Sequence, residues 1–149
     1  TLTKSNVLAE SRLFATLDPS SRRLKFPKDT EVIITDTVGF IKDLPEDLLV
    51  AFRATLEELE NADLLLHIID ISNPQYLTQI DSVERIIADL NLENTASIRV
   101  LNKIDRVKAD KVQKLNRQLG GMAISAKQKS TLLPLICRME SMLADIRPH

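Results

Sequence analysis

The sequence is poor in the residues that build disulfides and zinc sites. Its 149 residues include one cysteine, two histidines and three glycines, and it has no tryptophan. A single thiol cannot form an internal disulfide, which agrees with the reducing cytoplasm that we expect for this protein. One cysteine and two histidines do not make up a tetrahedral zinc site, so we expect no zinc. Cys137 lies in an apolar segment, and we expect its thiol to pack in the core.

Long apolar runs are missing as well. No segment approaches the roughly 20 apolar residues of a membrane-spanning helix, and the N-terminal residues do not read as a signal peptide. With 44% hydrophobic and 28% charged residues and a net charge of −1, the composition is typical of a globular domain. A balanced net charge gives the whole chain no attraction to nucleic acid, although local patches can still provide one.

What the sequence does contain is an alternation of strand-like and helix-like segments. Short β-branched or apolar runs predict strands at 31–36, 63–70, 96–101 and 122–124. Apolar residues at helical spacing predict helices over 45–60, 76–92, 109–119 and 129–146. This order predicts an α/β fold with a mostly parallel sheet and helices on both faces. The continuous apolar run at 63–70 predicts a strand covered on both faces.

Polar groups follow three of the predicted strands. The segments Asp36-Thr-Val-Gly39, Asn102-Lys-Ile-Asp105 and Ser125-Ala-Lys127 match, in order, the DxxG, NKxD and SAK boxes of GTP-binding proteins. From average amino-acid usage, DxxG arises by chance about once in two chains of this length, but NKxD in only roughly one in fifty. Ligands of parallel α/β sheets bind outside the carboxyl ends of the strands, so we expect GTP or GDP at this edge.

The NKxD box predicts a pocket that selects guanine. The guanine base presents two neighbouring donors, the N1 hydrogen and the 2-amino group, and one carboxylate accepts from both. Asp105 is therefore the expected guanine reader. Asn102 is expected to hold the loop and meet the acceptor edge of the base, and the aliphatic stem of Lys103 to lie over the ring.

The other two boxes are expected to complete the site. Ser125 and Ala126 would close the base pocket, with the Ala126 N–H suited to the guanine carbonyl oxygen, and Lys127 would cover the other face of the base. Asp36 lies where P-loop enzymes hold Mg²⁺ through a water. Gly39 has no side chain to keep its N–H from the γ-phosphate.

Several segments resemble the HflX family of ribosome-associated GTPases. Leu13-Phe-Ala-Thr-Leu-Asp-Pro19 is similar to the switch I signature of that family, and residues 36–41 and 48–57 are similar to its switch II and the helix that follows. The resemblance extends from about residue 6 to residue 127, and the FATLDP segment is its most specific part. The related Obg group has a similar Phe-x-Thr-Leu element.

The resemblance implies a P-loop NTPase-type, Ras-like fold that hydrolyses GTP with Mg²⁺ on the large ribosomal subunit. Thr16 matches the switch I threonine that meets Mg²⁺ and the γ-phosphate, so Thr16 and Gly39 are the expected catalytic residues, and Thr16 and Asp36 the expected metal ligands. Phe40 follows the DxxG glycine and offers no hydrogen bond to orient the attacking water. Intrinsic hydrolysis should therefore be slow or depend on a partner.

The phosphate-binding loop Gly-x4-Gly-Lys-[Ser/Thr] does not occur in the sequence, because none of the three glycines stands in that context. In the HflX family this loop, a first strand and a separate N-terminal domain precede the region that Thr1 matches. We therefore expect residues 1–149 to be an incomplete G domain that is inactive without the loop. Two alternatives are a non-enzymatic ribosome-binding module and an Obg-like GTPase of ribosome assembly.

Overall fold

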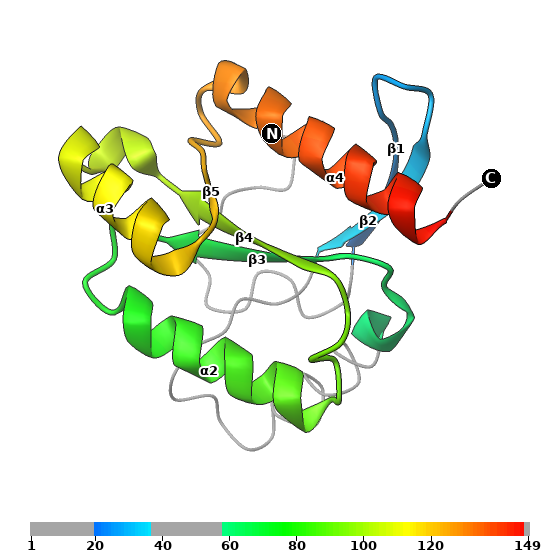
Figure 1. The fold of residues 1–149 in the computed structure, drawn as a ribbon, viewed down its shortest axis with the longest axis horizontal. Coiled ribbons are helices and arrows are strands. Elements are labelled where there is room, and N and C mark those ends of the chain that lie inside the picture. The colour runs from blue at the N-terminus through cyan, green and yellow to red at the C-terminus, as the bar shows by residue number, and fades with distance from the viewer. Residues whose placement is uncertain (1–19, 37–57, 148–149) are drawn as a thin grey trace.

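A computed structural model describes residues 20–36 and 58–147, which form two small sheets and three α-helices (Figure 1). The first sheet is an antiparallel hairpin of β1 (Ser20–Lys25) and β2 (Glu31–Asp36). The strand predicted at 31–36 is confirmed. The sequence analysis missed β1, whose SSRRLK sequence has few β-branched or aromatic residues to indicate a strand.

The second sheet is parallel, with the order β3–β4–β5. Its strands are β3 (Leu65–Asp70), β4 (Ser97–Asn102) and β5 (Met122–Ala123). The helices are α2 (Tyr76–Asp89), α3 (Ala109–Leu119) and α4 (Leu132–Ile146), and three short 3-10 turns are η1 (Glu58–Asn61), η2 (Ile104–Arg106) and η3 (Lys129–Thr131). These elements confirm the predicted alternation. Most of the helix predicted at 45–60 lies outside the described residues.

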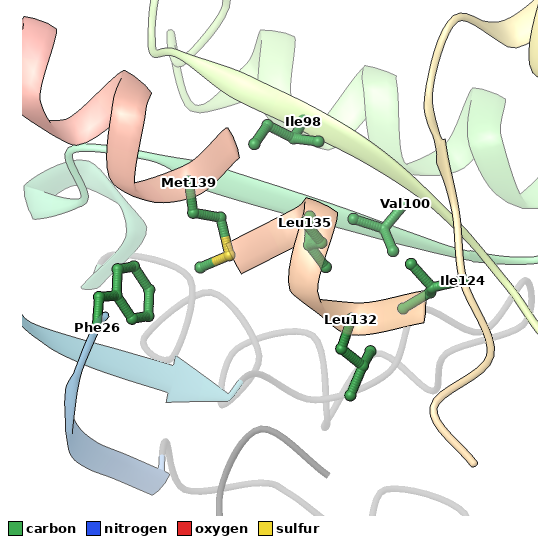
Figure 2. Close-up of a cluster of buried hydrophobic side chains, with 7 residues drawn as sticks. All are labelled: Phe26, Ile98, Val100, Ile124, Leu132, Leu135 and Met139. Atoms are coloured by element: carbon green, nitrogen blue, oxygen red, sulfur yellow. The ribbon is translucent and has the colours of Figure 1, made fainter. Parts of the chain in front are cut away.

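Helices cover the parallel sheet from two sides, with α2 on one side and α4 on the other (Figure 1). Two apolar clusters match this arrangement. One joins β4 to α4 and to the hairpin, and its members are shown in Figure 2: Phe26, Ile98, Val100, Ile124, Leu132, Leu135 and Met139. The other joins β3 and β4 to α2 and α3: Ile69, Ile71, Ile80, Leu101 and Leu115. Successive strand residues point to opposite faces, which is why Val100 and Leu101 belong to different clusters.

The hairpin is attached to α4 by one apolar and one polar contact. The Phe26 side chain is buried in the cluster around α4. Glu140 of α4 is also buried, with 3% of its surface exposed, and its Oε1 accepts a hydrogen bond of 2.9 Å from the backbone N–H of Lys28. Because an unpaired buried carboxylate is costly, this bond to the hairpin turn makes the buried position of Glu140 tolerable.

Helix α3 ends where the Gly120-Gly121 pair predicts. Gly120 has a φ of +61°, and its N–H donates to the Asn116 carbonyl at 3.0 Å, so it is a left-handed C-terminal cap. A Cβ on Gly121 would lie 2.7 Å from the carbonyl oxygen of Arg99, so the second glycine lets β5 approach β4.

Two expectations about burial are wrong. The Ile68 side chain in β3 is 53% exposed, so the strand at 63–70 is not covered on both faces along its whole length. Its neighbour Ile69 lies in the cluster on the α2 side, and Leu66 packs against the α4 cluster, so the exposed position lies near the C-terminal end of β3. Cys137 is exposed, because the apolar stripe of α4 runs through Leu135 and Met139 and residue 137 lies on the opposite side of the helix.

The described part of the chain contains no helix that is both long and apolar enough to cross a bilayer.

Replacement of Leu135 by alanine should strongly destabilise the fold. This side chain is 1% exposed at the centre of the α4 cluster, and such truncations cost about 2–5 kcal/mol. Leu133 lies in the same helix but is 56% exposed, so Leu133→Ala should change stability by less than about 0.5 kcal/mol. Urea denaturation gives both free energies of unfolding. Equal losses for the two variants would contradict the assigned packing of α4.

Candidate functional site at the carboxyl edge of the sheet

The NKxD and SAK segments lie side by side at the carboxyl edge of the parallel sheet. The register pairs Leu101 with Ala123, and the Ile124 N–H donates to the Leu101 carbonyl at 2.8 Å. Three residues after Leu101, the Ile104 N–H donates to the Ile124 carbonyl at 3.2 Å. The strand pairing thus brings together two turns that are about twenty residues apart in the sequence.

Asn102 joins these two turns through its side chain. Its Oδ1 accepts hydrogen bonds from the backbone N–H of Lys103 at 2.8 Å and from that of Ala126 at 3.1 Å. The first bond accompanies a left-handed backbone at Lys103, with φ +67° and ψ +36°. This conformation is unfavourable for a residue with a side chain and needs such support. Asn102 therefore holds the loop, as predicted, and it does so by binding the Ala126 N–H that was expected to meet the base.

Asp105 lies in η2 with an exposed side chain. Its Oδ1 accepts a hydrogen bond of 2.8 Å from the hydroxyl of Ser125. This bond is the main reason that the pKa of Asp105 lies below its ordinary value, and the neighbouring Lys127 and Arg106 charges act in the same direction. Asp105 is thus held as an ionised acceptor in a fixed orientation, which is what a reader of two guanine donors needs.

Ser125 is fixed by a residue that the sequence analysis did not single out. Ser125 is fully buried, and its backbone N–H donates to Thr131 Oγ1 at 2.9 Å. The Thr131 hydroxyl in turn lies 2.7 Å from the Gln128 carbonyl oxygen and 3.0 Å from that of Ser125. Thr131 closes the SAK turn onto the start of α4 and thereby supports the hydroxyl that contacts Asp105.

Lys103 makes an ion pair that was not predicted. Its Nζ lies 2.6 Å from Oδ2 of Asp70, the last residue of β3. The other oxygen, Oδ1, accepts from the Ser72 N–H at 3.0 Å and from the Ser72 hydroxyl at 2.6 Å. Partial burial raises the pKa of Asp70, but the bonds from Lys103 and Ser72 outweigh it, so the pKa is lowered. The sequence did offer one indication of this role, because Asp70 is an acid at the end of a predicted strand and lies at the same edge of the sheet as the NKxD and SAK segments.

The other predicted site residues are either described by the structure or lie outside the described residues. Ala126 is half-buried beside Asn102, and Lys127 is exposed. Thr16 and Gly39 lie outside the described residues, and only the backbone of Asp36, the last residue of β2, is described. The structure therefore brings together the residues that were predicted to bind the base, whereas their role and the predicted phosphate and Mg²⁺ ligands remain predictions. Within 20–36 and 58–147, no three His, Cys, Asp or Glu side chains form a group that could hold a metal ion.

A parallel sheet with helices on both sides and two polar turns meeting at its carboxyl edge is the architecture of a P-loop NTPase-type α/β protein. Comparison with known families narrows this class. The chain belongs to the family of 50S ribosome-binding GTPases, which its sequence matches over residues 1–103.

Curated relatives agree with the predicted resemblance to HflX. The chain is 40% identical over 141 residues to the GTPase HflX of Magnetococcus marinus, covering 93% of this chain and 32% of the relative. It is 52% identical over 104 residues to the GTPase HflX of Caldanaerobacter subterraneus, covering 70% and 24%. The GTPase HflX of Escherichia coli is 39% identical over 123 residues, covering 78% and 29%. The chain thus spans a quarter to a third of the length of these relatives.

Solved structures confirm the fold. The crystal structure of the SsGBP–GDP complex superposes with a TM-score of 0.72 at 24% identity, covering 86% of this chain and 43% of the other. A mutation variant of SsGBP gives a TM-score of 0.73 at 22% identity, covering 87% and 48%.

Neutralising Lys103 should raise the pKa of Asp70. In Lys103→Met the charge-assisted hydrogen bond is lost, so the carboxyl pKa should move up toward or above its ordinary value, which NMR titration measures. Since the pKa of Asp70 is lower in the folded state, this group stabilises the wild-type fold above the unfolded pKa of about 4, and the contribution is lost as pH falls through the folded value. The stability of Lys103→Met should decline less over that acidic window.

Lys108→Met is the matched control, because Lys108 is exposed and forms no ion pair with an acid of the described residues. An Asp70 pKa that is the same in Lys103→Met and in Lys108→Met would show that the ion pair does not exist in solution.

Proposed function

We propose that this chain provides the guanine-binding part of a cytoplasmic GTPase, which hydrolyses GTP to GDP and phosphate and acts on the large ribosomal subunit. The observation that carries the proposal is the convergence of Asn102, Asp105 and Ser125 in one hydrogen-bonded cluster at the carboxyl edge of the sheet. Family membership and the names of the HflX relatives support the reaction and the partner.

The chain's own residues account for discrimination between guanine and adenine. Asp105 offers a carboxylate to the two donors of guanine. Adenine presents an unprotonated N1 and no 2-amino group, so it would leave the acid without partners. Charge-assisted hydrogen bonds are worth about 1.5–3 kcal/mol, and a site that loses them rejects the wrong base strongly. Because Ser125 and Asn102 already fix the two turns, little ordering is left for the nucleotide to impose.

Lys103 contributes a second feature of the base pocket. Its ammonium is held by Asp70, so the aliphatic stem is stretched between β3 and the NKxD turn. A lysine stem held in this way offers an apolar surface to a ring and keeps its charge satisfied away from the base. Lys127, on the other turn, is exposed and available to cover the opposite ring face.

The proposed contacts to the phosphates and to Mg²⁺ are inferred from the sequence alone. Thr16 and Gly39 are the proposed contacts of the γ-phosphate, and Thr16 with Asp36 the proposed ligands of Mg²⁺. Bound Mg²⁺ neutralises charge on the phosphates. Phe40 cannot position the attacking water, which is why we propose that the ribosomal subunit stimulates turnover.

We further propose that residues 1–149 lack the first strand and the phosphate-binding loop of a complete G domain. The proposal rests on the absence of the Gly-x4-Gly-Lys-[Ser/Thr] pattern from the sequence and on the match to relatives about three times as long. Nucleotide affinity and turnover should therefore be measured on a chain that carries this loop ahead of residue 1.

Replacement of Asp105 by asparagine should change the preferred base. One carboxylate oxygen becomes an amide donor, which repels the guanine 2-amino group but suits xanthine, which carries a carbonyl there. Affinity for GDP should fall by about 10- to 100-fold, as expected for a lost charge-assisted hydrogen bond, and affinity for xanthosine diphosphate should rise. Calorimetric titration gives both values. Asp110→Asn, which changes an exposed acid in α3, should leave them unaltered, and unchanged GDP affinity in Asp105→Asn would refute the assigned reader.

Hydrolysis should depend on the ribosomal partner. The rate of phosphate release should be low for the loop-containing protein alone and should increase by at least about tenfold when 50S subunits are added, as a supplied water-orienting or charge-stabilising group would produce. At a GTP concentration below the wild-type Kd, Asp105→Asn should show no such increase. Turnover that stays at background with 50S subunits would instead favour the non-enzymatic ribosome-binding module.

A further inference from the structure

Positive charge is concentrated in one part of this otherwise balanced chain. Residues 103–129 contain eight of the chain's 20 basic residues but only two of its 21 acidic ones. All but Lys103 are exposed: Arg106, Lys108, Lys111, Lys114, Arg117, Lys127 and Lys129. A local excess of this size creates an attractive field for a polyanion even though the net charge of the whole chain is −1.

Helix α3 arranges three of these residues in a row. Lys111, Lys114 and Arg117 follow one another at a spacing of three and lie on the exposed side of the helix, while Leu115 packs into the core. None of the three forms an ion pair with an acid of the described residues, whereas Arg99 and Lys103 do. Within the described residues, no acid therefore pairs with these three charges.

A hollow with an aromatic wall adjoins this row of charges. Its volume is about 340 Å³, it is open to solvent, and it lies between the start of α2 and the face of α3. Its lining residues are Tyr76, Asp110, Lys111, Lys114, Leu115 and Gln118. Tyr76 is the only tyrosine of the chain and is half-buried at the edge of the cluster under α2 and α3. The hollow thus combines a ring, two ammonium groups, a side-chain amide and one carboxylate.

We infer that this face of the molecule, Tyr76 with Lys111, Lys114 and Arg117, binds a single-stranded segment of RNA. The inference rests on the proposed ribosomal partner and adds where the RNA contact lies. Single-stranded nucleic acid is bound by cationic side chains along the backbone together with aromatic rings on which bases stack. The α3 row supplies the phosphate contacts, Tyr76 supplies the stacking surface, and Gln118 and Asp110 supply polar groups for a base edge or a ribose hydroxyl.

Charge and shape favour RNA over an acidic peptide. A peptide carboxylate would use the lysines but would gain nothing from the tyrosine ring, and it would meet Asp110 at the same place. A nucleotide can use both parts, because its base can stack on the ring while its phosphate meets the lysines.

The test is binding of a fluorescein-labelled single-stranded RNA of about 12 nucleotides to the full chain, followed by anisotropy at several salt concentrations. Lys111→Ala/Lys114→Ala should lower affinity roughly tenfold and make the slope of log K against log salt shallower by about 1.4, because two phosphate contacts are lost. Lys25→Ala/Lys28→Ala removes the same charge from the hairpin, far from α3 in Figure 1, and should change neither quantity by more than about twofold.

Substitutions of Tyr76 provide a second, independent test of RNA binding. Tyr76→Phe keeps an aromatic ring and should bind RNA like the wild type, whereas Tyr76→Leu should lose about 5- to 100-fold. Since Tyr76 also contacts the core, thermal unfolding of both variants shows whether Tyr76→Leu is folded at the temperature of the assay. If Tyr76→Leu is unfolded at that temperature, the lysine variants test the RNA contact by themselves, because they change exposed side chains only.

Three results would overturn the inference. They are no RNA binding by the wild type, equal affinity and salt slope in Lys111→Ala/Lys114→Ala, and displacement of RNA by polyglutamate as efficiently as by unlabelled RNA. Sedimentation with 50S subunits separates this inference from the proposed function. If the RNA oligomer binds through α3 but the loop-containing protein does not bind 50S subunits, the ribosomal partner is wrong and the RNA surface stands.

Discussion

The parallel pairing of β4 with β5 is the constraint on which the candidate site depends. It places the residues after Asn102 and after Ala123 at one edge, where backbone bonds join Ile104 to Ile124. The side chain of Asn102 then closes the remaining gap by accepting from both turns. Without that register, the NKxD and SAK segments would be two separate loops. The proposed base pocket therefore depends on the pairing of β4 with β5 as well as on its side chains.

The burial of Ser125 stabilises the orientation of the exposed Asp105 side chain. Ser125 is fully buried and Asp105 is exposed, yet a single hydrogen bond connects them. The buried partner cannot exchange its bonds with water, so it is a firm support for the exposed one. Thr131 provides the same support from the α4 side. The exposed acid is thereby oriented by the core rather than by solvent, which lowers the cost of presenting it to a ligand.

Most of the fold, and the meeting of the NKxD and SAK segments at one edge of the sheet, could be predicted from the sequence. Runs such as 63–70 and 96–101 are apolar enough to indicate strands, and the spacing of the NKxD and SAK boxes after two of them determines where their residues lie. Strand β1 was missed because its residues are mostly polar, and its stability comes from pairing with β2. A tertiary contact of that kind leaves no mark on local composition.

The same reasoning explains why Asp70 and Thr131 were missed. Each acts through a hydrogen bond whose partner is fixed by the packed fold, at 33 residues' separation for Asp70 and Lys103. The position of Asp70 at the end of a predicted strand places it at the right edge of the sheet, but it does not identify Lys103 as its partner, and an isolated threonine such as Thr131 gives no such indication. Burial of Cys137 and Ile68 was overestimated for a related reason, since apolar character indicates which residues can be buried and not which neighbours exist to cover them.

The proposed guanine pocket and the basic face of α3 are connected by a short segment of the chain. Asp105 lies in η2, and α3 begins three residues after that turn ends. Ile104 and Val107, on either side of Asp105, pack against the same cluster that holds Leu115 on the inner side of α3. The proposed guanine reader and the proposed RNA contacts are therefore attached to one apolar cluster and separated by a short segment. A bound nucleotide can alter the affinity of α3 for RNA only if it contacts two arrangements of that segment differently.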